Sequence, residues 1–182
     1  NNYYARAFQS VYGKAPDKEL LAKAIAAFER TLETGDSPFD RFMNGDTSAV
    51  SKSVIRGREL FIGKANCFDC HFSPDFTADE FVNIGLFNGT DLRDSGRYGV
   101  TKQPEDIGKF KVPGLRNVAL TAPYMHNGMF ATLEKVIAYY NDPGSFIPDA
   151  RFRDPRIKKL GLTDQEKSDI AAFLRSLTTE SM

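Results

Sequence analysis

The chain has 182 residues, of which 41% are hydrophobic and 26% are charged, so it is long and apolar enough for a globular domain with its own core. Lys+Arg and Asp+Glu both number 24, and the resulting net charge of zero is atypical of proteins whose main partner is nucleic acid or an anionic membrane. No apolar run approaches the ~20 residues that a membrane-spanning helix needs.

The apolar spacing of the first sixty residues predicts helices. Near the start, aromatic residues recur at helical spacing: Tyr3, Tyr4, Phe8 and Tyr12. Asp17 is a suitable cap for a helix that ends at Gly35 and has the apolar stripe Leu20, Leu21, Ala24, Ile25, Phe28 and Leu32. Ser51 is a suitable cap for a further helix, which runs through Val54, Leu60 and Phe61 and stops at Gly63.

Residues 72–131 form a long stretch without sustained periodicity, and they hold much of the Gly and Pro. A short hairpin within residues 81–112 is the one strand pairing that the pattern leaves open. Such a length of irregular chain is typical of functional loops wrapped around something. A bound group with apolar faces would supply surface that this part of the chain lacks.

Two more helices are predicted near the end of the chain. Thr132 caps the first, whose apolar positions are Leu133, Val136, Ile137 and Tyr140. The second opens with Thr163 and Glu166 in a capping-box arrangement, and its stripe is Ile170, Phe173, Leu174 and Leu177.

Residues Cys67, Phe68, Asp69, Cys70 and His71 form the C-x-x-C-H pattern of covalent haem c attachment. Two thiols at this spacing lie on one face of a helical turn, where they can add to the two vinyl groups of one porphyrin. The next residue, His71, then lies under the iron and supplies its proximal nitrogen. The sequence therefore predicts one covalently bound haem c, held by Cys67, Cys70 and His71.

Three other interpretations of the motif remain. A structural zinc site needs four ligands, usually two Cys pairs or a Cys pair with a His pair, whereas this chain has two Cys in one motif and a second His far away at position 126. A thioredoxin-like redox pair would need a βαβ context, which the pattern does not show. In a haem-free protein made without the attachment machinery, the thiols would be free or bridged.

The same motif predicts a compartment. Haem c is attached on the oxidising side of a bacterial membrane, so we expect a periplasmic, exported protein. The sequence begins with Asn1 and shows no signal peptide, and we interpret it as a processed form or a fragment.

Several motifs occur in the order found in one known family. They comprise residues 26–32, 37–40, 57–71, 110–117, 122–128, 131–134 and the C-terminal stretch from residue 161 onward. With these motifs the chain resembles the bacterial di-haem cytochrome c peroxidase and MauG family over nearly its whole length. The resemblance implies a mainly α, cytochrome c-like domain with long irregular loops around one haem.

The chain departs from this family in one respect. Family members have two haem domains, each with its own C-x-x-C-H, whereas this chain has one such motif and no Trp, the residue that the family places between its haems. It resembles the C-terminal, electron-transferring half. The half that resembles the peroxide-reacting site is missing.

The resemblance also implies a sixth ligand for the iron. In cytochrome c peroxidases this ligand is a Met and in MauG-type members a Tyr, and alignment on residues 132–134 places Tyr140 there. The alternatives are Met129, Met125 and an open or water-filled position. Tyr140 is otherwise a core aromatic whose hydroxyl finds a backbone partner.

Four other residues are candidates for the site. The candidate roles of His126 are a haem ligand, a hydrogen-bond donor to a haem propionate and part of the electron path between haems. The structural alternative is a hydrogen-bonded histidine without a role at the haem. Arg116 pairs with a haem propionate or forms a surface salt bridge. Thr121 and Pro123 match family positions whose backbone carbonyls bind calcium, but the family's further donor comes from the missing half.

We treat residues 1–182 as a single haem domain, in which residues 1–50 form a helical segment that contacts the missing domain and residues 51–182 form the haem-binding core. The first functional hypothesis is the electron-transferring haem c domain of a di-haem peroxidase that reduces hydrogen peroxide. The alternatives are MauG-like oxidation of a protein substrate and a stand-alone mono-haem carrier. The expected partners are the peroxidatic haem domain and a small donor such as a cytochrome c or a cupredoxin, and the isolated chain should turn over peroxide poorly.

Overall fold

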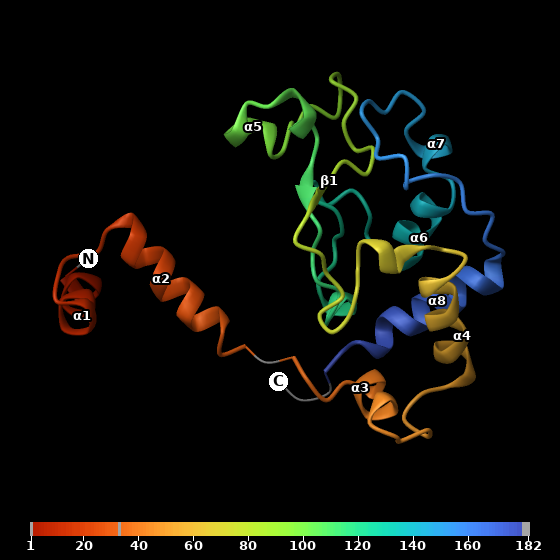
Figure 1. The fold of residues 1–182 in the computed structure, drawn as a ribbon, viewed down its shortest axis with the longest axis horizontal. Coiled ribbons are helices and arrows are strands. Elements are labelled where there is room, and N and C mark those ends of the chain that lie inside the picture. Colours follow the sequence, from red (N-terminus) through yellow and green to blue (C-terminus); the bar gives the residue numbers. More distant parts are fainter. Residues whose placement is uncertain (1, 33, 180–182) are drawn as a thin grey trace. The chain divides into compact units, whose positions relative to one another are not determined.

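A computed structural model describes residues 2–32 and 34–179. The chain divides between Gly35 and Asp36 into two compact units, which are described separately (Figure 1). Within the described residues, no helix combines the length and the apolar character that crossing a membrane requires.

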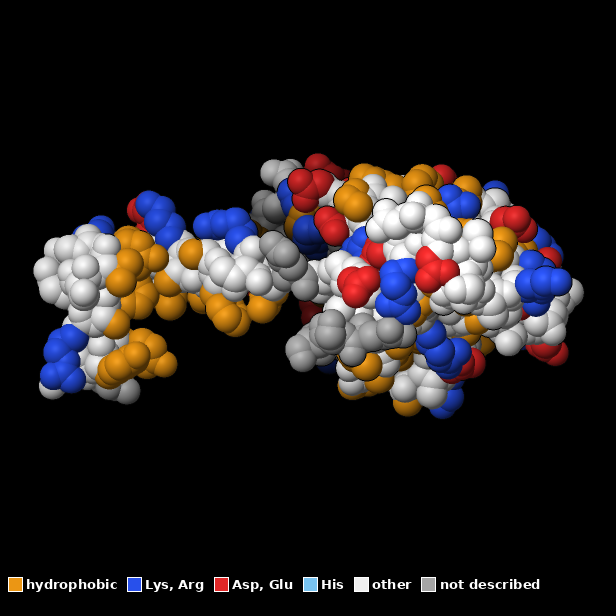
Figure 2. Space-filling model, turned by 90° about the horizontal axis from the view of Figure 1, so that it is seen from below, with side chains coloured by type: hydrophobic (Ala, Val, Ile, Leu, Met, Phe, Trp, Pro, Cys, Tyr) orange, Lys and Arg blue, Asp and Glu red, His pale blue; other side chains and the backbone are white. Residues whose placement is uncertain are grey.

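The N-terminal unit contains two helices, α1 (Asn2–Tyr12) and α2 (Lys18–Glu29). The Asp17 side chain caps α2 as predicted, by accepting a hydrogen bond from the backbone N–H of Leu20. The helix ends at Glu29 rather than at Gly35, so Leu32 lies beyond it. Of the predicted stripe, Leu20 is buried, but four large apolar side chains are exposed: Leu21, Ile25, Phe28 and Leu32. Figure 2 shows hydrophobic side chains along the surface of this unit.

The second unit is built on the helices α3 (Pro38–Met43), α4 (Lys52–Ile62), α6 (Leu133–Asn141), α7 (Pro143–Phe146) and α8 (Asp164–Ser176). The predicted caps Ser51, Thr132 and Thr163 each accept a hydrogen bond from the first turn of their helix. Helix α3 was not predicted, because Pro38 reads as part of a turn. It begins in a capping box between Ser37 and Asp40.

Helices α4 and α8 lie in direct backbone contact at Gly57. A Cβ atom at this position would lie 2.0 Å from the carbonyl oxygen of Asp169, so only glycine allows the two helices to approach this closely. Beside this contact the Asp169 carboxylate is 3% exposed and accepts both Nε and Nη2 of Arg56, each at 2.8 Å, and the Ser53 hydroxyl at 2.5 Å. These polar bonds fix the register of the two helices.

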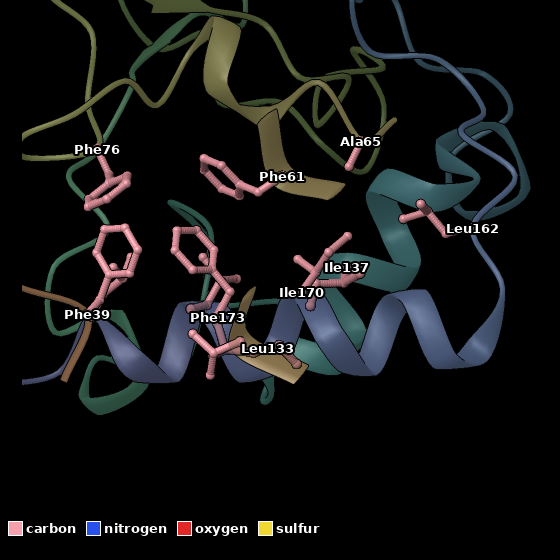
Figure 3. Packing of buried hydrophobic residues seen from close by; sticks show 13 residues of the cluster. Phe39, Phe61, Ala65, Phe76, Leu133, Ile137, Leu162, Ile170 and Phe173 are labelled. Carbon is pink, nitrogen blue, oxygen red and sulfur yellow. The ribbon is translucent and has the colours of Figure 1, made fainter. Parts of the chain in front are cut away.

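The hydrophobic core of the second unit, called the helical core, lies between α3, α4, α6 and α8. Figure 3 shows the rings of Phe39, Phe61, Phe76 and Phe173 gathered at one end of it. The ring centroids of Phe61 and Phe173 are 5.1 Å apart, and those of Phe39 and Phe173 are 5.2 Å apart in an edge-to-face arrangement. Aliphatic side chains such as Ile137, Leu162 and Ile170 continue the core toward the other end of α8.

Residues 72–131 are mostly irregular, as predicted, and contain one antiparallel strand pair. Strand β1 (Phe81–Val82) pairs with β2 (Phe110–Lys111), so the pairing closes a long loop rather than a tight hairpin. Short turns interrupt the loop: α5 (Tyr98–Thr101), η2 (Pro104–Asp106) and η3 (Val118–Leu120). The mainly helical, loop-rich architecture expected from the sequence is confirmed.

Two smaller apolar clusters support this loop region. The strand cluster consists of Ala78, Val82 and Val112, and the tyrosine cluster consists of Leu86, Phe130, Tyr139 and Ile147. Between them the buried amide of Asn83 donates to the carbonyl oxygens of Ile107 and Arg151, at 3.0 and 3.1 Å, and accepts the N–H of Gly85 at 2.8 Å. Buried polar groups of this kind need such partners, and they hold the irregular backbone in place.

Candidate functional site

The C-x-x-C-H motif begins as a single 3₁₀ turn, η1 (Cys67–Asp69). The Cys67 carbonyl accepts the backbone N–H groups of Cys70 and His71, at 3.2 and 3.0 Å, which closes the turn. Both thiols are free and partly buried. Cys67 packs against the helical core, whereas Cys70 packs against the strand cluster, so the motif lies where two apolar clusters meet.

Burial controls the chemistry of both thiols. It raises the pKa of Cys67 to about 12 and that of Cys70 to about 11, so both are protonated at neutral pH. In a protonated, apolar setting a pair of thiols is poorly suited to thiolate-based redox chemistry. Within the described residues, no group of three or more His, Cys, Asp or Glu side chains could hold a metal ion.

His71 is oriented by the loop that follows it. Its Nδ1 lies 2.9 Å from the carbonyl oxygen of Phe76, a buried member of the helical core. A carbonyl can only accept, so Nδ1 carries the proton and Nε2 keeps its lone pair for a metal. Burial lowers the pKa of His71, and the backbone carbonyls of Phe76 and Pro113 oppose this effect. The ring is therefore held as a neutral imidazole that could bind iron.

The two adjacent tyrosines of α6 differ in their hydrogen bonding. Tyr139 is fully buried, and its hydroxyl donates to the carbonyl oxygen of Ile84 at 2.6 Å. Tyr140 packs against the tyrosine cluster, and among the described residues its hydroxyl makes no hydrogen bond. Burial raises the pKa of Tyr140, and the neighbouring Tyr139, Cys67 and Cys70 add to the effect. Tyr140 thus lies within electrostatic range of both thiols of the motif.

Arg116 is engaged by an acidic residue of the protein itself. Its guanidinium forms a bidentate pair with Asp40, with both N–O distances at 2.9 Å, and its Nε donates to the carbonyl oxygen of Pro74 at 3.0 Å. The two side chains are only 15% and 20% exposed. Of the two predicted roles, the structure contains an ion pair, and it is largely buried rather than on the surface.

The other predicted residues lie on the loop that precedes α6. His126 is exposed and stacks on Phe110 of β2, with ring centroids 3.7 Å apart. Met125 is partly buried against the tyrosine cluster, whereas the Met129 side chain is 41% exposed. Thr121 and Pro123 are exposed, and the Thr121 hydroxyl donates to the Val118 carbonyl oxygen.

These side chains fit a covalently bound haem. Two free thiols lie in one turn, and an imidazole with its proton on Nδ1 follows them. The Tyr140 phenol, whose hydroxyl has no hydrogen-bond partner among residues 2–32 and 34–179, is electrostatically coupled to both sulfurs. The Phe76 carbonyl was missed by sequence reasoning, because a backbone acceptor leaves no signal in the residue type. The ion pair between Glu80 and Arg156, which acts on Cys70, was also not predicted, because 76 positions separate its two residues in the sequence.

Two family models match the chain. A model described as Di-haem cytochrome c peroxidase matches residues 1–48, and a model described as Cytochrome c matches residues 54–178. The first match ends shortly after the division between the two units, and the second covers the motif, α6 and α8.

The chain is also similar to individual proteins. It is 39% identical to cytochrome-c peroxidase IdrP1 of Denitromonas iodatirespirans, over 96% of this chain and 54% of that protein. It is 36% identical to the methylamine utilization protein MauG of Methylorubrum extorquens, over 97% of this chain and 50% of that protein. A crystal structure of a MauG-like protein associated with microbial copper homeostasis matches with a TM-score of 0.76 and 37% identity, over 87% of this chain and 56% of that one. The chain spans about half the length of these relatives.

Proposed function

Because the chain belongs to the di-haem cytochrome c peroxidase and MauG family, we propose that it is the haem c domain that passes electrons between an external donor and a second, peroxidatic haem domain. The observation that carries this proposal is that Cys67, Cys70 and Tyr140 pack against three different apolar clusters, next to an imidazole, His71, that the Phe76 carbonyl orients. When bound, the haem supplies a one-electron couple between Fe(III) and Fe(II).

In this proposal each residue has a separate task. Cys67 and Cys70 hold the haem covalently, so it stays bound when the coordination of the iron changes. His71 presents Nε2 as the proximal ligand, because the Phe76 carbonyl keeps the proton on Nδ1. The apolar clusters against which Cys67 and Cys70 pack would shield a bound haem from water.

Tyr140 is the proposed sixth ligand. The contrast with Tyr139 supports this role. The Tyr139 hydroxyl donates a hydrogen bond to a backbone carbonyl, whereas the Tyr140 hydroxyl has no such partner among the described residues. Burial favours the neutral phenol, so ligation to ferric iron would have to provide the positive charge that stabilises a phenolate. A phenolate ligand favours Fe(III) and therefore lowers the reduction potential.

The proposed partners and location follow from the family. A small donor protein, such as a cytochrome c or a cupredoxin, delivers electrons to this domain, which has one covalent haem c, in the periplasm. The domain passes the electrons to a peroxidatic haem domain, where hydrogen peroxide is reduced to water. The match of residues 1–48 to the di-haem peroxidase model supports such a domain, as does the exposed apolar side of α2.

Two further roles are proposals of the same kind. The carbonyls of Thr121 and Pro123 would contribute to a calcium site that is completed by the other haem domain. MauG-like oxidation of a protein substrate is the second candidate function, and the tyrosine at position 140 favours it over a peroxidase with a methionine ligand.

The assignment of Tyr140 is tested by the absorption spectrum of the haem-loaded protein. We expect Tyr140→Phe to change the ferric spectrum and the spin state of the iron, because the sixth ligand is lost. Tyr139→Phe is the matched control, since it removes a neighbouring hydroxyl on the same helix that faces the Ile84 carbonyl. It should leave the spectrum unchanged.

An unchanged spectrum in Tyr140→Phe would rule out ligation by this residue. A change in Met125→Leu or Met129→Leu instead would assign the ligand to that methionine. The electron-transfer role requires the same loaded chain to accept electrons from reduced cytochrome c while turning over hydrogen peroxide poorly. Brisk peroxide turnover by these residues alone would contradict it.

A further inference from the structure

Arg156 lies between two carboxylates in the second unit. Its Nη1 and Nη2 donate to the two carboxylate oxygens of Glu80, at 3.0 and 3.2 Å. Its Nε and Nη2 donate to the two carboxylate oxygens of Asp154, at 3.0 and 2.9 Å. We call Glu80, Asp154 and Arg156 the acidic triad, because two carboxylates and one guanidinium leave it with a net charge of −1.

The backbone fixes the acidic triad to the strand pair. The Glu80 carbonyl oxygen accepts the N–H of Val112 at 3.0 Å, and the N–H of Asp154 donates to the carbonyl oxygen of Asn83 at 2.9 Å. Cys70 packs against the strand cluster, to which Val112 belongs. The triad and Cys70 are therefore held against the same short element, although Asp154 and Arg156 lie far from Cys70 and Glu80 in the sequence.

The charges of the triad act directly on the motif. Burial is the largest cause of the raised pKa of Cys70, and the Glu80 carboxylate raises it further. The charge of Asp154 acts in the same direction, and Arg156 opposes it. Glu80 also acts on His71, where its charge partly offsets the effect of burial on the imidazole pKa. Glu80 thus acts electrostatically on both a thiol and the imidazole of the site.

We propose that the acidic triad sets the reduction potential of the haem by holding a net negative charge beside its Cys70 edge. This inference rests on the proposed function, because it requires a haem attached through Cys70. A negative charge stabilises the more positive ferric state. The Glu80 and Arg156 side chains are 36% and 34% exposed, so water partly screens the effect and an intermediate dielectric constant applies. In this proposal Glu80 and Arg156 act on the haem through their charges and do not contact a substrate.

The opposite signs within the triad make the proposal testable by charge removal. The loaded chain is poised electrochemically at the midpoint potential of the wild type, and the ratio of ferrous to ferric haem is read from the absorption spectrum. For Glu80→Gln we expect this ratio to rise about fivefold, the size expected for one charge at ~10 Å and an effective dielectric constant of about 30. For Arg156→Gln it should fall by a similar factor. The double variant should lie between them.

Glu134→Gln is the matched control, because it removes the same charge from an exposed pair with Arg175 on the outer side of α6 and α8. It should leave the ratio within about twofold of the wild type, since exposed charges are strongly screened. Asp154→Asn provides a second test of the negative charges, with a rise in the ratio as the expected result. If Arg156→Gln yields no folded haem protein, the Asp154→Asn result tests the effect of the triad's charge in its place.

Ratios that stay unchanged in both Glu80→Gln and Asp154→Asn would overturn this inference. They would leave the proposed function intact, provided that Tyr140→Phe still changes the ferric spectrum. A wild-type chain that attaches no haem in a host with the attachment machinery would instead overturn the proposed function, and this inference with it.

Discussion

The helices and the loops of the second unit are stabilised in different ways. In the helical core, α4, α6 and α8 bury phenylalanine and aliphatic side chains against one another. In residues 72–131 the strand cluster is small, and buried amides such as Asn83 and Asn88 organise the backbone by hydrogen bonds. The helices thus supply their own apolar surface. The loops supply mainly polar supports and gain apolar contacts from the helices and, by our proposal, from the haem.

The largest effect is expected at the contact between α4 and α8. In Gly57→Ala the new methyl group would meet the Asp169 carbonyl oxygen at 2.0 Å, so the helices must separate. We expect the free energy of unfolding to fall by about 3 kcal/mol or more, as measured by urea unfolding. Gly99→Ala in α5 is the control, because its Cβ has nothing within 4 Å. An equal decrease in the free energy of unfolding in the two variants would show that the helical core does not dominate the stability of the protein.

A smaller effect is expected from the Asp169 carboxylate. Hydrogen bonds from Arg56 are the largest cause that lowers its pKa, to about 2, against an opposing effect of burial. Its pKa in the unfolded chain is about 4, so unfolding binds a proton in this range. The stabilisation is therefore complete above about pH 5 and is lost as the pH falls from about 4 to 2.

The pH dependence of stability distinguishes an ionised Asp169 carboxylate from an uncharged hydrogen-bonding group at the same position. At pH 5 we expect Asp169→Asn to lower the free energy of unfolding by about 2 kcal/mol, and by about 1 kcal/mol less at pH 3. The measurement is urea unfolding of both proteins at the two pH values. A difference that stays constant with pH would contradict the ionised pairing of Asp169.

The smallest effect is expected where α6 meets the loops. Tyr139→Phe removes the hydrogen bond to Ile84 and leaves that carbonyl without its partner, at a cost of about 1 kcal/mol. Hydrogen exchange should accelerate in residues 83–88 while α8 stays protected. Tyr98→Phe, on the partly exposed α5, should change neither. Faster exchange throughout α8 would show that loops and helical core open together.

The sequence predicted best what is encoded locally. The caps Ser51, Thr132 and Thr163 were confirmed, because a cap needs only a suitable side chain a few residues from the groups that it satisfies. The spacing of α2 correctly predicted a helix. It did not predict which of its apolar side chains are buried, since burial depends on what packs against the helix.

Contacts between residues far apart in the sequence could not be predicted from local sequence patterns. Tyr139 lies off the predicted apolar stripe of α6, yet it is fully buried, because the loop at Ile84 covers a second face of that helix. Arg116 and Asp40 are 76 positions apart, and nothing in the neighbourhood of either residue indicates the pair. The motif predicted the chemistry that we propose for the site, whereas the charges that surround it depend on the tertiary fold.

The separate packing of Cys67 and Cys70 also has a consequence for biosynthesis. One sulfur is held against the helical core and the other against the strand cluster, and both are partly buried in the finished fold. A porphyrin must reach both sulfurs from the same side to be attached to them. We therefore expect the attachment machinery to act on a chain whose loops are still open, so that maturation ends, rather than begins, with the closing of residues 72–131.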